Sequence, residues 1–380
     1  MKIALVGRGF STSWGGAERV GVNLATSLKE AGHSVALYSA RADPAVAGIE
    51  VTQVEASGFS SALKVLGFNK GVGKLLRCSD QDVIVGLTQI YPLDIYRAGG
   101  GVYAHWMRLR YPSFYQRLLK YIFAPVHPAM LRLEKKIMAP GNCRYVITNS
   151  KLVKGHMESC FGVPPEKIRV IYNGIDHSVF NPELRRHRKE VRERLGIGEQ
   201  DVVALFVSNN WKRKGFGTIV RAMARAPYLK VLVVGRGSTA LQNAAVKRMG
   251  LGGGGGGNLF FAGASQKVEE YYGAADFFVL PTRYDPCSNA CLEAMASGLP
   301  VITTTENGAS EFIKEGRNGY ILDMWSDDDK LAEFFMRFKV QGERKRMGRA
   351  AAAAVKDLTI ENCTSQIIEL CELVMREKAT

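Results

Sequence analysis

The sequence predicts an α/β protein with two domains, each built around a parallel sheet, and two observations lead to this fold class. Short apolar segments that suit buried strands alternate with segments of helical spacing. The alternation also stops once and restarts, and a length of 380 residues suits two domains better than one. Because parallel strands need crossover connections of one hand, both domains are expected to be Rossmann-like.

The first series begins with an apolar strand predicted at 2–6, a loop that contains Gly15 and Gly16, and a helix predicted over 17–31. A strand predicted at 33–39 completes a βαβ unit. Further strands of this series are predicted at 82–87, 145–148 and 169–172.

The second series follows a stretch dense in arginine and lysine, 183–194, which we interpret as a linker and a solvated helix. Its strands are predicted at 202–207, 229–234, 259–262, 277–280, 301–304 and 319–322. The tail, 331–376, is predicted to be largely helical. Ligands of such sheets bind at the carboxyl ends of the strands, so the two domains are expected to face each other across a shared cleft.

Charge and cysteine content narrow the function classes. The formal net charge of +15 indicates an anionic partner, which the charge alone leaves open between nucleic acid, an acidic membrane surface and a phosphorylated substrate. Seven cysteines without a C-x-x-C pair or zinc spacing suggest reduced, structural thiols in a cytosolic protein. The N-terminal apolar run is too short for a signal peptide, and no stretch approaches the ~18 apolar residues of a membrane span.

The stretch 281–300 carries the strongest candidate site. It is predicted to be a strand end, a loop and a short helix that Ser288 or Asn289 can cap. Asp285 would then lie in the loop before the helix, and Glu293 on the helix. Carboxylates accept hydrogen bonds from sugar hydroxyls, and helix N-termini attract phosphate, so the stretch suits a hydroxylated anion. A capped helix with two solvated acids is an equally open interpretation.

Two other segments could bind phosphate. Arg213 and Lys214 follow the strand predicted at 202–207, where they could neutralise a diphosphate leaving group. An isolated charge run is more often a solvated face, but this position favours the functional interpretation. Gly15 and Gly16, at the start of a helix, would let the backbone approach a diphosphate closely, although a simple strand-to-helix turn would look the same.

Three other patterns are set aside. The segment 235–240 matches G-x-G-x-x-A, but the acidic residue expected about 20 positions later is replaced by the glycine run 252–257. The match is therefore weak, and nicotinamide binding is set aside. That run is interpreted as a flexible surface loop. The acidic triplet 327–329 is interpreted as a helix cap, and no metal is predicted.

The order of these motifs resembles that of the family 4 retaining glycosyltransferases. The matching segments are Gly15-Gly16-Ala17-Glu18, Asn173-Gly174-Ile175-Asp176, Arg213-Lys214-Gly215, Asp285 and Glu293 with the run L-E-A-M-A-S-G-L-P-V, and Asn307-Gly308-Ala309-x-Glu311. The segment 97–106 further resembles the lipopolysaccharide core glucosyltransferases, which add glucose to the inner-core heptose.

This resemblance implies the GT-B fold, in which two Rossmann-like domains face each other across a cleft and a C-terminal helix returns to the N-terminal domain. The acceptor-binding domain would span 1–178 together with the helix 361–380. The nucleotide-sugar-binding domain would span 179–360.

The resemblance also implies roles for single residues. Asp285 and Glu293 have the spacing of the family's paired glutamates, of which the first contacts the donor sugar and the second the nucleotide ribose. Because Asp285 is shorter than the usual glutamate, the identity of the donor sugar is open. The rest of the donor set comprises Gly15 and Gly16 at the diphosphate, and Ser288, Asn289, Ala290 and Asn173 at the nucleotide or sugar.

Two further positions depart from the family pattern. Lys214 has the place of the family's diphosphate-binding lysine, but Asn209 has the place of its arginine, so Arg213 is expected to substitute. The family's histidine near the reacting sugar corresponds either to His105 or to Tyr103. We take His105 as the catalytic candidate beside Asp285, with a surface histidine on a helix as the alternative.

The segment 103–136 interleaves aromatic residues with seven basic residues against Glu134 as its single acid. This composition suits an anionic bilayer interface. It also suits single-stranded nucleic acid. The membrane is favoured because a lipid-linked acceptor is expected.

These arguments predict a retaining, metal-independent hexosyltransferase that needs no cofactor. It would transfer a hexose, glucose in the first instance, from a UDP-sugar to a lipid-linked or lipopolysaccharide-core acceptor. The enzyme is expected to be cytoplasmic, peripheral on the inner face of the cytoplasmic membrane, and free of nucleic acid. A sugar-nucleotide epimerase of the same fold and a basic nucleic-acid-binding α/β protein remain the alternatives.

Overall fold

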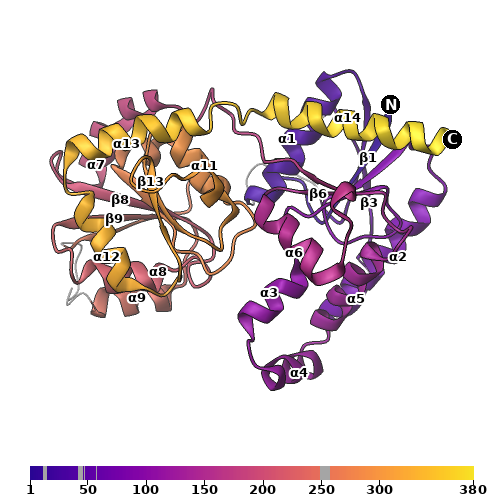
Figure 1. The fold of residues 1–380 in the computed structure, drawn as a ribbon, viewed down its shortest axis with the longest axis horizontal. Helices are drawn as coiled ribbons and strands as arrows, with labels where there is room; N and C mark the ends of the chain where they lie inside the picture. Colours follow the sequence, from indigo (N-terminus) through magenta and orange to yellow (C-terminus); the bar gives the residue numbers. More distant parts are fainter. Residues whose placement is uncertain (12–14, 42–45, 47, 57, 249–256) are drawn as a thin grey trace. The chain divides into compact units, whose positions relative to one another are not determined.

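The computed structural model describes residues 1–380 except 12–14, 42–45, 47, 57 and 249–256, so most of the glycine run lies outside the described residues. The chain forms two compact units (Figure 1). The first comprises Met1–Gly174 and Ile360–Thr380, and the second comprises Ile175–Thr359. The chain passes from the first unit to the second after Gly174, earlier than the boundary expected after residue 178. The Ile175 amide already bonds to the Leu358 carbonyl, at 2.8 Å, inside the second unit.

The first unit is a doubly wound α/β domain. Its described strands form a seven-stranded parallel sheet in the order β3-β2-β1-β4-β5-β6-β7. The strands are β1 (Lys2–Gly7), β2 (Ser34–Ser39), β3 (Glu50–Gln53), β4 (Val83–Gly86), β5 (Ile95–Arg97), β6 (Tyr145–Thr148) and β7 (Ile168–Val170). The helices are α1 (Gly16–Glu30), α2 (Ser61–Arg77), α3 (Tyr103–Arg110), α4 (Phe114–Phe123), α5 (Val126–Met138), α6 (Lys151–Phe161), the short 3₁₀ helix η2 (Pro165–Lys167) and α14 (Ile360–Ala379).

Alternation along β1 explains how the two faces of this sheet are covered. Ile3 and Leu5 belong to a core shared with α1 and α14, whereas Ala4 and Val6 belong to a core shared with α2, α5 and α6. Side chains of successive strand residues point to opposite faces, so one apolar strand supplies both cores. The C-terminal helix α14 therefore belongs to the first unit, where it lies beside α1 (Figure 1).

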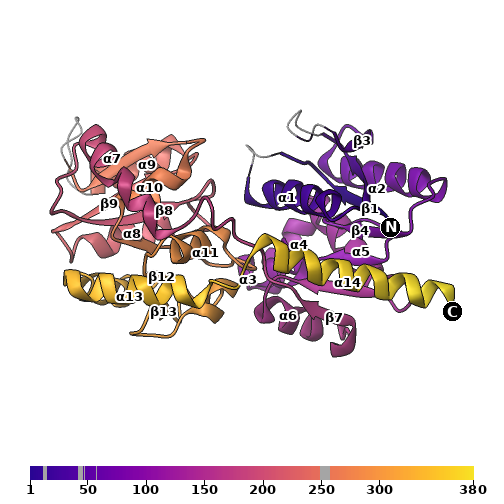
Figure 2. The same cartoon turned by 90° about the horizontal axis from the view of Figure 1, so that it is seen from above.

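The second unit repeats the architecture, with helices on both faces of its sheet (Figure 2). Its described strands form a six-stranded parallel sheet in the order β10-β9-β8-β11-β12-β13. The strands are β8 (Val202–Val207), β9 (Leu229–Val234), β10 (Leu259–Gly263), β11 (Phe277–Val279), β12 (Val301–Thr304) and β13 (Gly319–Leu322). The helices are η3 (Pro182–His187), α7 (Arg188–Leu195), α8 (Phe216–Met223), α9 (Thr239–Arg248), α10 (Val268–Ala274), α11 (Asn289–Ala296), η4 (Gly308–Phe312), α12 (Asp328–Arg337) and α13 (Gln341–Ala354).

In each sheet, successive strands are first added on one side of the starting strand and then on the other. The point where the side changes marks the expected binding edge. In the first sheet this point lies between β1 and β4, and in the second between β8 and β11. Open α/β sheets bind ligands beyond the carboxyl ends of the strands at such a switch point. The loops after β8 and β11 are therefore where a site in the second unit should form.

The basic stretch 183–194 is not a linker, which corrects the prediction from its composition. It forms η3 and α7, which pack on α10 inside the second unit. Arg192 is 1% exposed, and its guanidinium Nη2 lies 2.8 Å from the Asp276 carboxylate. Three more arginines, Arg185, Arg188 and Arg344, lie within 4.0 Å of the same carboxylate. We call this group the Asp276 cluster.

Two further predictions concern single segments. The acidic triplet acts as a helix cap as predicted, since the Asp327 side chain accepts the Lys330 N–H at 2.9 Å. The 17-residue helix α2 was not predicted, and it contains Gly67, Gly71 and Gly73, which weaken a helical pattern. None of the helices in the described ranges is both long enough and apolar enough to cross a membrane.

Candidate active site

The second unit pairs a cation and a carboxylate at its switch point. Lys214 follows β8 and Asp285 follows β11, and the Lys214 ammonium forms an ion pair with the Asp285 carboxylate. Their side chains are only 12% and 11% exposed. Burial lowers the pKa of Lys214, the Asp285 carboxylate opposes that shift, and the nearby Arg213 cation adds to it. The pair is therefore held largely away from solvent at the edge where a ligand would bind.

The loop after β8 is fixed against the loop after β11 through backbone contacts. Gly215 has φ +79°, and a Cβ atom there would lie 1.9 Å from the Pro281 carbonyl oxygen, so the crossing requires glycine. The Arg213 carbonyl accepts the Arg283 N–H at 2.9 Å and the Thr282 hydroxyl at 3.3 Å. Lys214 is thus placed by its rigid neighbours on both sides.

Asn307 braces the loop that carries Asp285. Its side chain is fully buried, and its Oδ1 accepts the N–H groups of Ser288 and Ala309, both at 3.1 Å. Its Nδ2 donates to the Thr303 hydroxyl at 2.8 Å. The Asp285 N–H donates to the carbonyl just before Asn307, at 2.9 Å. The Asn307 side-chain amide therefore helps to join the Asp285 loop to the start of α11.

Helix α11 presents its N-terminus and a second carboxylate, as predicted. Ser288 is the N-cap residue, but its side chain makes no capping hydrogen bond. The first amides of the helix therefore favour an anion. Asn289 and Ala290 form the first turn and are half-buried. Glu293 is 8% exposed and accepts a hydrogen bond from the Tyr272 hydroxyl at 2.9 Å.

In the first unit, the predicted glycines lie at the start of α1. Gly15 is the N-cap residue and Gly16 the first helical residue. Gly15 has an extended backbone and no side chain to cap the helix, so the first amides are again suited to an anion. Glu18 in the first turn carries a negative charge, which would oppose such an anion.

Asn173 lies at the end of the same unit's main segment and is 6% exposed. Its side-chain oxygen accepts a hydrogen bond from Nη2 of Arg97 at 2.6 Å. The structure thus places Asn173 against a buried arginine.

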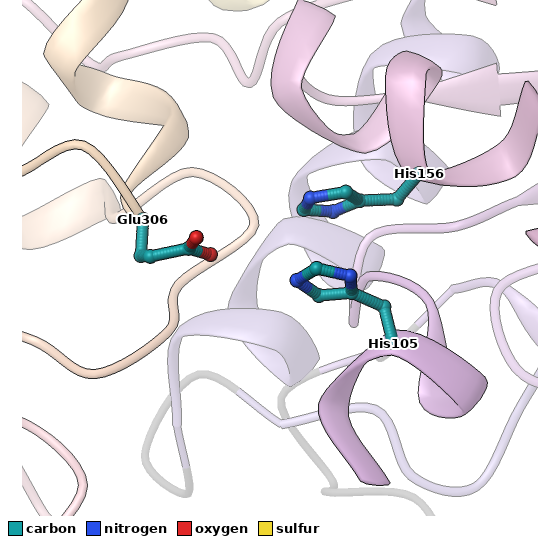
Figure 3. Close-up of side chains that lie close together, drawn as sticks. All are labelled: His105, His156 and Glu306. Atoms are coloured by element: carbon teal, nitrogen blue, oxygen red, sulfur yellow. The ribbon is translucent and has the colours of Figure 1, made fainter. Parts of the chain in front are cut away.

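His105 lies on α3 and stacks on His156 of α6, with ring centroids 3.5 Å apart and planes 17° apart (Figure 3). Glu306, also labelled in Figure 3, belongs to the second unit. His105 is half-buried, so it is not a freely exposed histidine. The hydroxyl of Tyr103 is bonded to Nδ1 of His127 on α5. The structure thus places His105 against His156 and Tyr103 against His127.

The predicted residues fall into two groups, one in each unit. The second unit brings together Arg213, Lys214, Asp285, Ser288, Asn289, Ala290 and Glu293 at one sheet edge. The first unit holds Gly15, Gly16, His105 and Asn173. Two supporting residues were not given roles from the sequence. Asn307 stands in a matched motif that carried no role, and Tyr272 precedes Glu293 by 21 positions with no pattern to link them.

Two family models match the chain, one in each half. Residues 14–179 match the model described as Glycosyltransferase Family 4, and residues 201–338 match the model described as Glycosyl transferases group 1. Together the two matches cover most of the chain.

Relatives with curated descriptions agree with these models. An uncharacterized glycosyltransferase of Methanocaldococcus jannaschii is 31% identical over 46% of this chain and 45% of the relative. The match spans 45% to 64% of the length of four such relatives. Lipopolysaccharide glucosyltransferase WaaG of Escherichia coli K12 is 22% identical over 86% of this chain and 87% of WaaG.

Solved structures show the same fold. The crystal structure of WaaG, a glycosyltransferase involved in lipopolysaccharide biosynthesis, superposes with a TM-score of 0.84 at 20% identity, covering 97% of this chain and 99% of that chain. Anabaena HepE, in complex with UDP and glucose, superposes with a TM-score of 0.74 at 20% identity, covering 98% and 99%. The predicted fold class is confirmed. The chain therefore carries two glycosyltransferase domains, Glycosyltransferase Family 4 over residues 14–179 and Glycosyl transferases group 1 over residues 201–338, and its two Rossmann-like units have the GT-B fold.

Proposed function

We propose that this glycosyltransferase moves a hexose, glucose in the first instance, from a UDP-sugar to a lipid-linked or lipopolysaccharide-core acceptor. Retention of configuration, independence from metals and the absence of any cofactor are part of the proposal. WaaG matches this chain over most of the length of both proteins, and its name, lipopolysaccharide glucosyltransferase, supports the acceptor class and the sugar. The HepE complex supports a UDP donor. Retention rests on the resemblance to family 4.

The observation that carries the proposal is the Lys214–Asp285 pair beside the N-terminus of α11. When the bond between the sugar and the diphosphate breaks, negative charge develops on the departing phosphate oxygen. Lys214, Arg213 and the first amides of α11 are the groups of the second unit suited to stabilise it. Asp285 would orient the sugar hydroxyls, and Glu293, held by Tyr272, would accept hydrogen bonds from the ribose.

A screen of nucleotides and sugar nucleotides by thermal unfolding tests this proposal. UDP and one UDP-hexose should raise the unfolding midpoint, by an amount that grows with affinity, whereas GDP and ADP should not. Glu293→Gln should weaken UDP binding by about tenfold, because a charge-assisted hydrogen bond contributes roughly 1.5–3 kcal/mol. Asp285→Asn should leave UDP binding intact and reduce turnover.

Matched controls are the exposed acids Glu333→Gln and Asp329→Asn in the same unit, which should behave as wild type. If both site variants keep wild-type kinetics and binding, the site assignment is wrong. Conversion of the donor without any acceptor would identify an epimerase. Steeply salt-dependent binding to DNA without affinity for UDP would instead favour the nucleic-acid alternative.

We also propose that the segment 103–136 contacts an anionic membrane, mainly through α4. Every residue of α4 is at least partly exposed, including Phe114 at 65% and Phe123 at 79%. Figure 1 shows α4 at the far end of α3 and α5 from the sheet. Arg117 and Lys120 share this helix, and apolar and basic side chains together suit the headgroup region. By contrast α5 buries Met130, Leu133 and Ile137, so only part of the segment is available.

Liposome binding tests this contact. Replacing Arg108, Arg110, Arg117 and Lys120 by Ser should weaken binding to anionic vesicles by about two to three orders of magnitude, at ~1 kcal/mol per basic residue. Affinity for UDP should not change. The control removes the same charge from the second unit, with Arg186, Lys189, Lys267 and Arg346 replaced by Ser. Equal losses in both variants would show a general charge effect and refute a dedicated surface.

A further inference from the structure

Arg97 ends β5 and is 6% exposed. Its Nη2 donates to the Asn173 side-chain oxygen at 2.6 Å. Among the residues that the structure describes, no carboxylate lies within ion-pair distance of its guanidinium, and its Nε has no hydrogen-bond acceptor. A buried cation is costly unless it is paired and hydrogen-bonded, because burial removes its hydration. Arg97 therefore keeps most of its bonding capacity unused.

Arg97 lines a pocket whose lining residues all belong to the first unit. Val20 and Leu24 of α1 and Ile367 of α14 form apolar walls, and Thr364 of α14 adds a hydroxyl. None of the residues that line it is acidic. The pocket therefore offers one cation, with the polar side chains of Asn23 and Thr364, among mainly apolar walls, a combination that suits an oxyanion carried on a larger group.

The position of Arg97 in the sheet also points to a ligand. β5 pairs with β6, and β6 ends in Thr148, which is fully buried; Asn149 follows and is 1% exposed. Polar side chains thus gather at the carboxyl edge of the sheet, where α/β folds bind their ligands. A guanidinium presents donors in a planar fork that matches phosphate or carboxylate oxygens.

We propose that Arg97 and Asn173 form a subsite for an oxyanion, a phosphate or carboxylate group, on the acceptor. This inference rests on the proposed function, in which the first unit holds the acceptor. The cations assigned to the donor diphosphate, Arg213 and Lys214, belong to the second unit. The acceptor class is therefore an acidic glycan, and Arg97 selects it by charge.

Inorganic phosphate and UDP serve as probes, with the full chain. Thermal unfolding is followed against phosphate at constant ionic strength, with saturating UDP so that the donor diphosphate position is filled. Wild type should show a saturable rise of the midpoint. Arg97→Met should weaken phosphate binding by about tenfold or more, and Arg97→Lys by less, because lysine keeps the charge and loses the fork. Arg77→Met, an exposed arginine on α2, is the control and should match wild type.

Asn173→Asp provides a second variant of nearly unchanged shape. Its carboxylate would pair with Arg97 and repel an incoming anion, so the phosphate response should disappear while the fold remains. If Arg97→Met does not fold, this variant decides. A wild-type phosphate response in Asn173→Asp, or no response in wild type, overturns the proposal.

UDP affinity separates the two possible sources of the oxyanion. It should be unchanged in Arg97→Met, since the donor diphosphate is assigned elsewhere. A tenfold loss of UDP affinity in this variant would assign Arg97 to the donor and overturn the acceptor subsite. Wild type that fails to bind UDP refutes the proposed function instead, and the phosphate titration, then run without UDP, still reports on Arg97.

Discussion

Asp276 of the second unit and Arg97 of the first are both buried charges, but their surroundings differ. The Asp276 carboxylate lies within 4.0 Å of four guanidinium groups. Arg97 donates to one amide, and the described residues offer it no carboxylate. The first unit also holds the converse case, since Glu134 is fully buried and, among the described residues, accepts hydrogen bonds only from the N–H groups of Tyr103 and Ala104.

This contrast separates buried charges that stabilise the fold through ion pairs from buried charges that lack a counter-ion and are suited to bind a proton or a ligand. In the Asp276 cluster the guanidiniums are also bonded to backbone carbonyls, such as that of Ala274 at 2.9 Å from Arg192. Both carboxylate oxygens of Asp276 already have guanidinium partners. A lone buried charge must instead bind a counter-ion, change its pKa, or remain costly. Glu134 shows the second outcome, because burial raises its pKa to about 7.

The largest expected effect comes from breaking the cluster. Asp276→Asn leaves Arg192, which is 1% exposed, without its carboxylate, and should cost about 3–5 kcal/mol of unfolding free energy. Urea unfolding measures the loss, with the exposed Asp323→Asn as the control. UDP affinity of the folded fraction should stay at the wild-type value. A cost below about 1 kcal/mol, the range of surface pairs, would contradict a structural role for the cluster.

The Lys214–Asp285 pair is expected to act differently, because under the proposed function its cation also binds the donor diphosphate. Lys214→Met should reduce turnover by about 10²–10³-fold, the typical loss when one preorganised group at a developing charge is removed. Release of UDP from the donor found in the screen measures turnover. Unfolding stability should change far less than in Asp276→Asn. Lys345→Met, an exposed lysine in the same unit, is the control. A variant that loses stability and keeps turnover would class this pair with the Asp276 cluster.

The smallest effect concerns pH and Glu134. Because the pKa of Glu134 is raised from 4.5 to about 7, the folded protein binds its proton more tightly than the unfolded chain does. Its contribution to stability is therefore fully present below pH 4.5 and is lost as the pH rises through 7. The loss should total roughly 3 kcal/mol, at ~1.4 kcal/mol per pKa unit.

Comparison with Glu134→Gln isolates this contribution. Burial lowers the pKa of the neighbouring His127, which gives the opposite slope and remains in both proteins. Urea unfolding at pH 5 and pH 8 should show the glutamine variant gaining stability relative to wild type at the higher pH. Parallel pH profiles for the two proteins would rule out a buried, unpaired carboxyl.

The sequence predicts most of the second sheet, and the reason is burial. β8, β9, β12 and β13 have the predicted bounds because each is a run of mainly apolar or β-branched residues that is almost fully enclosed. In the first unit, β5 is only three residues long and was not predicted, since such a short segment carries no period. The helix α2 was hidden by its glycines.

The candidate site shows the same division between local and tertiary information. Lys214, Asp285 and Glu293 could be found because each has a fixed place after a predicted strand. The burial of Arg192 could not, because its partner Asp276 is 84 positions away and a dense charge run looks solvated. The same holds for Arg97, because only the folded structure places it in a pocket lined by α1 and α14.

The chain passes from the first unit to the second and back, and this has a consequence for the construction of chimeric enzymes. The chain enters the second unit at Ile175 and leaves it at Thr359, and these two residues are bridged to each other within that unit. The second unit is thus an insertion closed at its own base, and the Asp276 cluster lies inside it. Residues 175–359 can be exchanged for the equivalent block of a relative without cutting either core. Under the proposed function, one such replacement would exchange the donor-binding unit and leave the acceptor-binding unit unchanged.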